Sequence, residues 1–149
     1  MAAGQGNRMK SDIPKVLHPI AGESMLGYVI DVARQLEPEH INIVHGFQGD
    51  QLKEKYTTPD LSWSHQSEQL GTAHALAQAA PSIPNDHDVL VMCGDAPLIT
   101  YSSLKNLFDK KYDDQVVLLT SLMQDPTNYG RIIRDQSNSI ISIVEEQDA

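Results

Sequence analysis

Apolar positions along this chain follow two patterns, helical spacing and short uninterrupted runs. Between Ser24 and Leu36 they recur three and four residues apart, which predicts an amphipathic helix that Ser24 caps and Pro38 ends. The β-branched run at residues 41–44 is instead typical of a buried strand. By the same criteria we expect further helices at residues 49–56, 71–80 and 102–112, and further strands at residues 61–65, 88–92 and 116–122.

Helices therefore alternate with strands over most of the chain. This alternation indicates an α/β fold, a Rossmann-like, doubly wound and mostly parallel sheet with right-handed crossovers. Near the end, residues 130–134 and 139–144 flank a Gln-Ser-Asn turn and predict an antiparallel hairpin. The sequence contains no internal repeat, low-complexity tract or linker, so we expect residues 1–149 to belong to one domain.

The chain opens with a glycine-containing loop that reads A-A-G-Q-G-N-R-M. Gly4 and Gly6 lack Cβ atoms, so their N–H groups can approach an anion closely and form a concave nest. Arg8 and Lys15 add two positive charges, and the four residues together predict a phosphate site for a nucleotide or sugar phosphate. The loop is neither a Walker motif nor a dinucleotide fingerprint, because Met9 fills the third glycine position and no Lys-Ser/Thr pair follows the second glycine. A surface turn with solvated charges is the alternative.

Loops of this kind follow a β-strand, and no strand precedes this one in the sequence. We therefore expect a partial domain that starts just after its first strand. A central strand would bury about four apolar side chains at ~1.5–3 kcal/mol each, which is comparable to the roughly 5–15 kcal/mol net stability of a whole domain. The chain as it stands is accordingly expected to be inactive or poorly stable.

Asp95 follows the predicted strand 88–92 within C-G-D-A-P-L, at the sheet edge where ligands bind. Mg²⁺ typically binds one or two carboxylates together with substrate phosphates and water. Asp95 is thus a candidate ligand of a Mg²⁺ cofactor, and a turn or capping aspartate beside Gly94 and Pro97 is the alternative. We expect Cys93 to pack at the strand end, with a catalytic thiol as the less favoured interpretation.

A third candidate segment reads Q-S-E-Q-L-G-T-A-H-A. Gly71 and Thr72 begin the predicted helix, so N–H groups there face outward and can meet an anion. Gln66 offers both a donor and an acceptor, which suits the edge of a nucleobase. Ordinary helix capping would explain Thr72 without a ligand. The six histidines show no metal-binding spacing, and no Ser-His-acid grouping indicates a nucleophilic triad.

Charge and composition narrow the class of partner. The net charge is −9, which argues against broad contact with nucleic acid or an anionic membrane, although residues 1–22 alone carry +2. A local basic site on an acidic chain suits a small polyphosphate. No apolar run approaches the roughly 20 residues of a membrane helix, no secretory signal is visible, and the lone cysteine fits a reducing cytoplasm.

Taken together, these segments resemble the N-terminal uridyltransferase domain of the bacterial bifunctional N-acetylglucosamine-1-phosphate uridyltransferase and glucosamine-1-phosphate acetyltransferase family. The matching letters run in one order from residue 2 to the end. They are A-A-G-Q-G-N-R-M, D-I-P-K-V-L-H, Q-S-E-Q-L-G-T-A-H-A, G-D-A-P-L, D-P-T-N-Y-G-R-I and I-V-E-E-Q-D-A. The glycine loop and G-D-A-P-L recur in many sugar nucleotidyltransferases, whereas the third and fifth segments are narrower.

The resemblance implies a nucleotide-diphospho-sugar transferase fold that transfers UMP from UTP to N-acetylglucosamine-1-phosphate. The products would be UDP-N-acetylglucosamine, a precursor for peptidoglycan, the cell wall and lipopolysaccharide, and pyrophosphate. The resemblance also implies Mg²⁺ and a cytoplasmic homotrimer assembled through a C-terminal left-handed β-helix, which carries the acetyltransferase activity and is absent from these 149 residues.

The same resemblance assigns roles to individual residues. It implies that Arg8 and Lys15 make catalytic contacts to the phosphates and that Asp95 ligates magnesium. It implies sugar contacts from Gly130 and Glu145 and uracil contacts from Gln66, Gly71 and Thr72. The remaining residues implied to contact the nucleotide or substrate are Ala2, Ala3, Gly4, Cys93 and Gly94.

Three positions depart from the family pattern. Met1 replaces an aliphatic strand residue, Cys93 replaces a common aromatic, and Gln147 replaces a usual lysine, which weakens one basic contact. The family's second metal ligand would lie beyond residue 149. Another sugar-phosphate nucleotidyltransferase, or a non-catalytic nucleotide-binding fragment, therefore stays open as an alternative.

Overall fold

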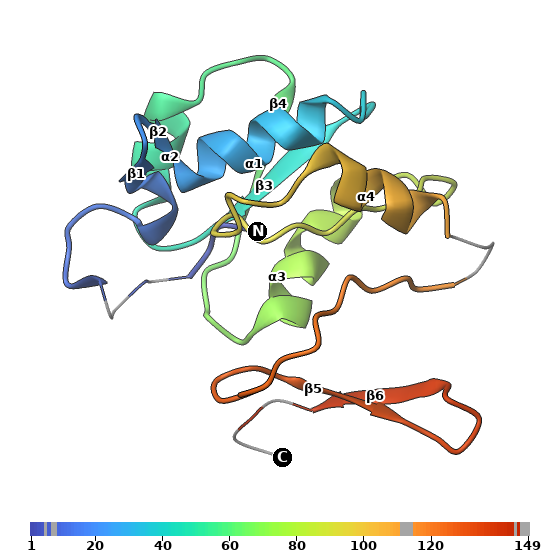
Figure 1. Cartoon of the computed structure of the whole chain (residues 1–149). Coiled ribbons are helices and arrows are strands. Elements are labelled where there is room, and N and C mark those ends of the chain that lie inside the picture. The colour runs from blue at the N-terminus through green and yellow to red at the C-terminus, as the bar shows by residue number, and fades with distance from the viewer. Residues whose placement is uncertain (5, 7–8, 111–114, 145, 147–149) are drawn as a thin grey trace. The chain divides into compact units, whose positions relative to one another are not determined.

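Two parallel strands form the centre of the N-terminal part of the chain in the computed structural model (Figure 1). β3 (Ile41–His45) pairs with β4 (Leu61–His65), with the two strands in register along their whole length. The structure describes residues 1–4, 6, 9–110, 115–144 and 146, and it divides into two units, Met1–Lys111 and Tyr112–Ala149. Both strands were predicted from their β-branched or apolar runs, and both are confirmed.

Helices cover both faces of this strand pair. Because successive side chains of a strand point to opposite faces, the neighbours Ile43 and Val44 belong to different apolar clusters. α1 (Met25–Arg34) and α2 (Gly49–Lys55) pack on the Ile43 side, and α3 (Thr72–Ala79) packs on the Val44 side. The predicted α/β class, with helices on both faces of a parallel sheet, is confirmed. The first cluster contains Ala2, Val16, Leu26, Ile30, Ile43, Leu52 and Leu61, and the second contains Ala3, Val44, Ala75 and Ala79.

Local sequence signals set the ends of α1. The Ser24 hydroxyl accepts the Gly27 N–H at 3.1 Å, as the predicted cap requires. The helix ends earlier than predicted, because Glu37 adopts a left-handed φ of 51° directly before Pro38. Upstream of the helix, the chain contains a 3-10 turn, η2 (Lys15–Leu17), and a small hairpin of β1 (Pro19–Ile20) and β2 (Glu23–Ser24).

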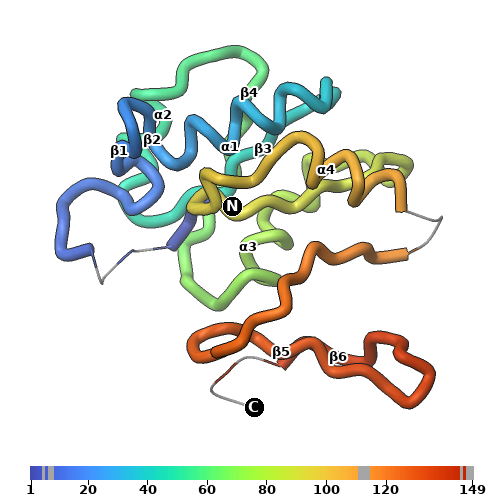
Figure 2. Tube along the Cα trace, viewed as in Figure 1, coloured from blue at the N-terminus to red at the C-terminus, as the bar shows by residue number. Residues whose placement is uncertain are grey.

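The first residues of the chain lie between β3 and the segment that follows α3 (Figure 2). The Ala2 N–H donates to the Val44 carbonyl at 2.7 Å, and Ala2 forms a parallel bridge with His45. On the other side, the Met1 amino group donates to the Met92 carbonyl at 2.5 Å, and the Gly94 N–H donates to the Met1 carbonyl at 2.8 Å. The glycine loop therefore starts at the carboxyl end of β3.

Residues 88–92 were predicted to form a buried strand, and this prediction is wrong. The segment follows α3 and the 3-10 turn η3 (Ala80–Ser82) and has no strand partner in the part of the chain that the structure describes. Val89 and Val91 are 50% and 42% exposed. The apolar run is present, but a strand also needs a neighbouring edge to pair with, and the space beside this segment holds a groove instead. The chain then continues into α4 (Tyr101–Phe108), which Thr100 caps.

The second unit contains the predicted hairpin. β5 (Arg131–Arg134) and β6 (Ile140–Val144) pair antiparallel, with an irregular register between Ile133 and Arg134. The strand predicted at residues 116–122 is not observed within the described residues, and its side chains at Val116 and Leu122 are almost fully exposed. Neither unit, where it is described, contains a helix long and apolar enough to cross a bilayer.

His87 lies on the surface between two carboxylates. Its Nε2 is 2.6 Å from a Glu39 carboxylate oxygen, and its Nδ1 is 3.0 Å from an Asp86 oxygen. Hydrogen bonding to Glu39, and secondarily to Asp86, raises the pKa of His87 above its ordinary value of about 6.5. Because the folded state favours the protonated ring, this contribution to stability is complete below the unfolded pKa and is lost as pH rises through the folded pKa.

We therefore expect His87→Gln to lower the thermal midpoint at pH 5.5 and to have no effect at pH 9. Thermal unfolding followed by circular dichroism at both pH values measures this difference. Asn85→Gln, a neutral substitution at a nearby exposed position, serves as the control and should show no such pH-dependent gap. An equal effect of His87→Gln at the two pH values would contradict the charged pairing.

Candidate functional site

A cavity of about 280 Å³ opens where β3 and β4 end. Its walls come from the glycine loop at the start of the chain, the segment after β4, and the turn after residue 92. This placement agrees with the rule that open α/β sheets bind ligands outside the carboxyl ends of their strands. The lining residues are Met1, Ala2, Ala3, Gly4, Lys15, Val16, Gln66, Gln69, Gly71, Thr72, Ala75, Cys93 and Asp95.

The glycine loop places Lys15 at this cavity through a close backbone approach. Gly6 has a left-handed φ of 63°, and a Cβ atom at this position would lie 2.7 Å from the Cβ of Lys15. Only a residue without a side chain allows this contact. The second loop glycine therefore packs the loop against the lysine, a role that the sequence alone did not reveal.

Lys15 and Asp95 form an ion pair inside the cavity. The Lys15 ammonium donates to a carboxylate oxygen of Asp95 at 2.6 Å, and the two side chains are 37% and 39% exposed. This hydrogen bond is the main reason that the pKa of Asp95 is lowered, so the carboxylate is ionised at neutral pH. The cavity therefore contains one cationic and one anionic side chain, which are bonded to each other.

Gly94 fixes the position of Asp95 from behind. It is buried, and a Cβ atom there would lie 2.9 Å from the Met1 carbonyl oxygen and 3.4 Å from Leu26 and Val16 side-chain atoms. The absence of a side chain lets the turn approach the first residues of the chain. Cys93, which we expected to pack at a strand end, is instead exposed and lines the cavity, because residues 88–92 form no strand that would bury it.

The opposite wall is the start of α3. Gly71 precedes the helix and Thr72 is its first residue, without a side-chain cap, so the capping interpretation of Thr72 is wrong. Gln66 is only 3% exposed, and its Nε2 donates to the Gly71 carbonyl at 3.1 Å. This amide N–H is therefore already hydrogen-bonded within the protein, whereas the sequence suggested that it would be free to donate to a ligand.

The structure brings most of the predicted site residues together. Nine of the predicted residues line this one cavity, and Gly94 lies directly behind it: the nine are Ala2, Ala3, Gly4, Lys15, Gln66, Gly71, Thr72, Cys93 and Asp95. Arg8 and Glu145 lie outside the described residues, as does Gln147. Gly130 belongs to the second unit. The chemical roles of all these residues stay predictions.

Sequence reasoning overlooked Gln69. This residue lines the cavity, and its Nε2 lies 2.6 Å from where a Cβ of Gly46 would stand. It belongs to the Q-S-E-Q-L-G-T segment, which was singled out for Gln66, Gly71 and Thr72 alone. The signal that could have found it is its place between two residues already predicted to face the ligand.

The cavity offers few groups for a metal ion. Among the described residues, no group of three or more His, Cys, Asp or Glu side chains could hold one. A single carboxylate at Asp95 still fits Mg²⁺, which commonly takes one or two carboxylates and obtains its other ligands from substrate phosphates and water. A metal at this position would therefore depend on the nucleotide for much of its coordination.

Comparisons with known proteins agree with this geometry. The family model of the MobA-like NTP transferase domain matches residues 1–139. The Bifunctional protein GlmU of Pseudomonas entomophila is 52% identical over all 149 residues, which are 32% of its own length. The protein of the same name from Pseudomonas aeruginosa PAO1 is also 52% identical, with 33% of its length covered, so the chain spans about a third of these relatives.

Solved structures show a similar fold. Rv0371c from Mycobacterium tuberculosis H37Rv aligns with a TM-score of 0.63 at 24% identity, over 72% of this chain and 56% of the other. The same protein in complex with manganese aligns with a TM-score of 0.60 at 20% identity, over 72% and 54%.

Proposed function

This chain belongs to the family of MobA-like NTP transferase domains, and on that basis we propose that it transfers UMP from UTP to N-acetylglucosamine-1-phosphate. The products would be UDP-N-acetylglucosamine and pyrophosphate. The observation that carries the proposal is that the glycine loop, the Lys15–Asp95 pair and the start of α3 share one cavity. The 50–52% identity to proteins named GlmU supports the choice of this member of the family.

The protein would contribute to this reaction mainly by positioning the substrates and by stabilising charge. A phosphate oxygen of the sugar phosphate would attack the α-phosphorus of UTP, the bond from that phosphorus to the bridging oxygen would break, and pyrophosphate would leave. Backbone N–H groups of the glycine loop and the Lys15 ammonium would hold the phosphates and offset the charge that develops on them. A divalent cation, Mg²⁺ in our proposal, would be held by Asp95 and the phosphates and would neutralise charge on the leaving group.

The base would lie on the α3 side of the cavity. Gln66 and Gln69 both face this region, and Gly71 and Thr72 present the backbone at the start of the helix. Because the Nε2 of Gln66 already bonds to the Gly71 carbonyl, Gln66 would fix the shape of this wall and Gln69 would be the freer amide. Amide groups read a pyrimidine edge by donating and accepting hydrogen bonds.

For the whole protein we also propose a cytoplasmic enzyme of cell-wall and lipopolysaccharide precursor synthesis that assembles as a trimer through a further domain. The 149-residue chain covers only about a third of its relatives. We accordingly propose that the chain by itself has little or no turnover. Turnover is therefore best measured in a chimera, in which this chain replaces the matching third of the Pseudomonas aeruginosa protein.

The test combines binding by the chain with turnover by the chimera. Calorimetric titration of the 149-residue chain with UTP, CTP, ATP and GTP in the presence of Mg²⁺ should show binding of UTP most strongly. The chimera should release pyrophosphate from UTP with N-acetylglucosamine-1-phosphate faster than with any other sugar phosphate. Preference for another pair would favour a different sugar-phosphate nucleotidyltransferase, and Mg²⁺-independent binding without turnover would favour a non-catalytic nucleotide-binding fragment.

A further inference from the structure

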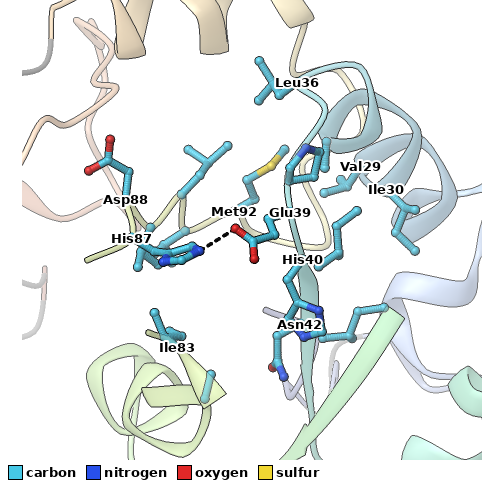
Figure 3. Close-up of a pocket in the computed structure, with 18 of the residues that line it drawn as sticks. Val29, Ile30, Leu36, Glu39, His40, Asn42, Ile83, His87, Asp88 and Met92 are labelled. Carbon is cyan, nitrogen blue, oxygen red and sulfur yellow. Dashed lines mark hydrogen bonds and ion pairs between the residues drawn. The ribbon is translucent and has the colours of Figure 1, made fainter. Parts of the chain in front are cut away.

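Two cavities of the N-terminal unit differ in their chemistry. A groove of about 710 Å³ between β3 and residues 88–92 is lined mostly by apolar side chains, including Val29, Ile30 and Met92 (Figure 3). The cavity that we propose for the nucleotide is smaller and has polar side chains on its α3 side. Behind that wall lies His74, a residue of α3 that does not line the cavity and has no part in the reaction as described so far.

The His74 ring meets two groups with opposite requirements. Its Nδ1 is 3.1 Å from the Gln66 Nε2 and 3.0 Å from the Glu68 carbonyl oxygen. The first contact requires Nδ1 to accept a hydrogen bond, the second requires it to donate one, and a ring nitrogen cannot do both. The tautomer of His74 therefore decides whether the second N–H of the Gln66 amide has a partner.

The surroundings favour the tautomer in which Nδ1 accepts from Gln66. The Glu68 carbonyl already accepts the Leu70 N–H at 2.9 Å, and Glu68 is an exposed residue. Gln66 is only 3% exposed, so an unpaired N–H there would have little access to water. Leaving a buried donor unsatisfied costs more than an ordinary hydrogen bond contributes. The proton of the His74 ring therefore belongs on Nε2.

With this tautomer, both amide protons of Gln66 are bonded inside the protein. One is donated to the Gly71 carbonyl at 3.1 Å, and the other is donated to the His74 ring. The Gln66 Oε1 accepts no hydrogen bond from the described residues and is not enclosed by them. Because Gln66 lines the cavity, its amide can offer a ligand the oxygen but neither N–H.

We propose that His74 is a positioning residue for base selection, which holds the Gln66 amide so that its oxygen, and not its nitrogen, meets the nucleobase. Uracil carries an N–H at position 3, which would donate to this oxygen. Cytosine in the same orientation would bring the lone pair of its N3 against the oxygen, and this repulsion would disfavour CTP. The inference rests on the proposed function, because it takes the base to lie on the α3 side of the cavity.

Loss of the His74 acceptor would release one N–H of Gln66. Only the bond to the Gly71 carbonyl would then orient the amide, and the released N–H would be free to donate to the N3 of cytosine. One hydrogen bond corresponds to about five- to tenfold in an equilibrium, so the preference for UTP over CTP should fall by that factor. Because contacts to the base are equal in the ground state and the transition state, the change should appear mainly in KM.

The experiment measures kcat and KM of the chimera with UTP and with CTP. His74→Leu removes the acceptor and keeps a bulky side chain, whereas His74→Asn places an amide oxygen near the position of Nδ1, since both atoms are bonded to Cγ. Gln78→Leu is the matched control, because Gln78 lies one turn further along α3, does not line the cavity and donates to the His74 backbone carbonyl and not to its ring. If His74→Leu does not fold, His74→Ala replaces it, because alanine is the most favourable residue in a helix.

We expect His74→Leu to lower the ratio of kcat/KM for UTP to that for CTP by about five- to tenfold, through a higher KM for UTP. His74→Asn should keep this ratio within about twofold of the parent, and Gln78→Leu should leave it unchanged. Gln66→Met removes the amide and keeps the length of the side chain. In a chimera that carries Gln66→Met, His74→Leu should have no further effect on the ratio, because the histidine acts through Gln66.

Three results would overturn this inference and leave the proposed function in place. They are an unchanged ratio in His74→Leu, a loss in His74→Asn as large as in His74→Leu, and a further loss when His74→Leu is added to Gln66→Met. A parent chimera that shows no turnover, or no preference for UTP, would instead overturn the proposed function and this inference with it. The behaviour of the parent therefore distinguishes the two failures.

Discussion

Replacing Lys15 by alanine is expected to lower kcat/KM for pyrophosphate release by about 10²–10³ in the chimera, the loss typical of one preorganised charge contact. Lys15 reaches the cavity from η2 and is held there by the close approach of Gly6. Among the described residues that line the cavity, it carries the only side-chain ammonium. Without it, phosphate oxygens would meet the Asp95 carboxylate without the ammonium that now pairs with it. Initial rates over a range of UTP concentrations measure the effect.

Lys53→Ala is the matched control, since Lys53 is an exposed lysine on α2 and does not line the cavity. It should leave kcat/KM within twofold of the parent. Titration of the 149-residue chain with UTP gives a second readout, in which Lys15→Ala should weaken binding. A change of less than tenfold in kcat/KM for Lys15→Ala would remove Lys15 from the phosphate site.

Asp95→Asn is expected to lower kcat by a similar factor of about 10²–10³ and to abolish the tight binding of a divalent cation with UTP. Asparagine keeps the size of the side chain and can still accept from Lys15, so the loss would follow from the missing charge. Electron paramagnetic resonance of Mn²⁺, titrated into the 149-residue chain with UTP, measures the cation independently of turnover.

Asp31→Asn provides the comparison for this variant. Asp31 also faces a cation, with 3.7 Å between its carboxylate and the Arg34 guanidinium, but it lies on α1 and does not line the cavity. It should change neither Mn²⁺ binding nor rate. Normal Mn²⁺ binding by Asp95→Asn would show that the cation site lies elsewhere.

Local patterns predicted the helices and the central strand pair well. Ser24 capped α1 as expected, and the runs at residues 41–44 and 61–65 became β3 and β4. These features depend on nearby residues, namely capping groups, proline and β-branched side chains, which a single sequence displays directly.

Long-range features were less accessible. The runs at residues 88–92 and 116–122 have strand-like composition, yet the structure describes no strand in either. A strand is defined by the edge beside it, and composition does not reveal whether that edge is occupied. The hairpin of β5 and β6 was predictable because each strand finds its partner a few residues away.

The cavity was predictable as a set of motifs, but its internal contacts were not. The sequence suggested Gly4, Lys15 and Asp95 as a group, and the structure places them around one space. It did not reveal that Gly6 packs on Lys15, that Gln66 is buried, or that Gln69 joins the wall. Each of these depends on the three-dimensional approach of residues far apart in the chain.

The ion pair between Lys15 and Asp95 has a consequence for the order of events at the cavity. While no ligand is bound, the two groups neutralise each other, and neither is offered freely to an incoming ion. If a nucleotide arrived together with its cation, Asp95 and Lys15 could change partners in one step. The Asp95 carboxylate would then bind the metal, and the Lys15 ammonium would bind a phosphate. Free metal or free triphosphate would each have to separate the pair alone, so the complex of the two is the form that this cavity is suited to admit.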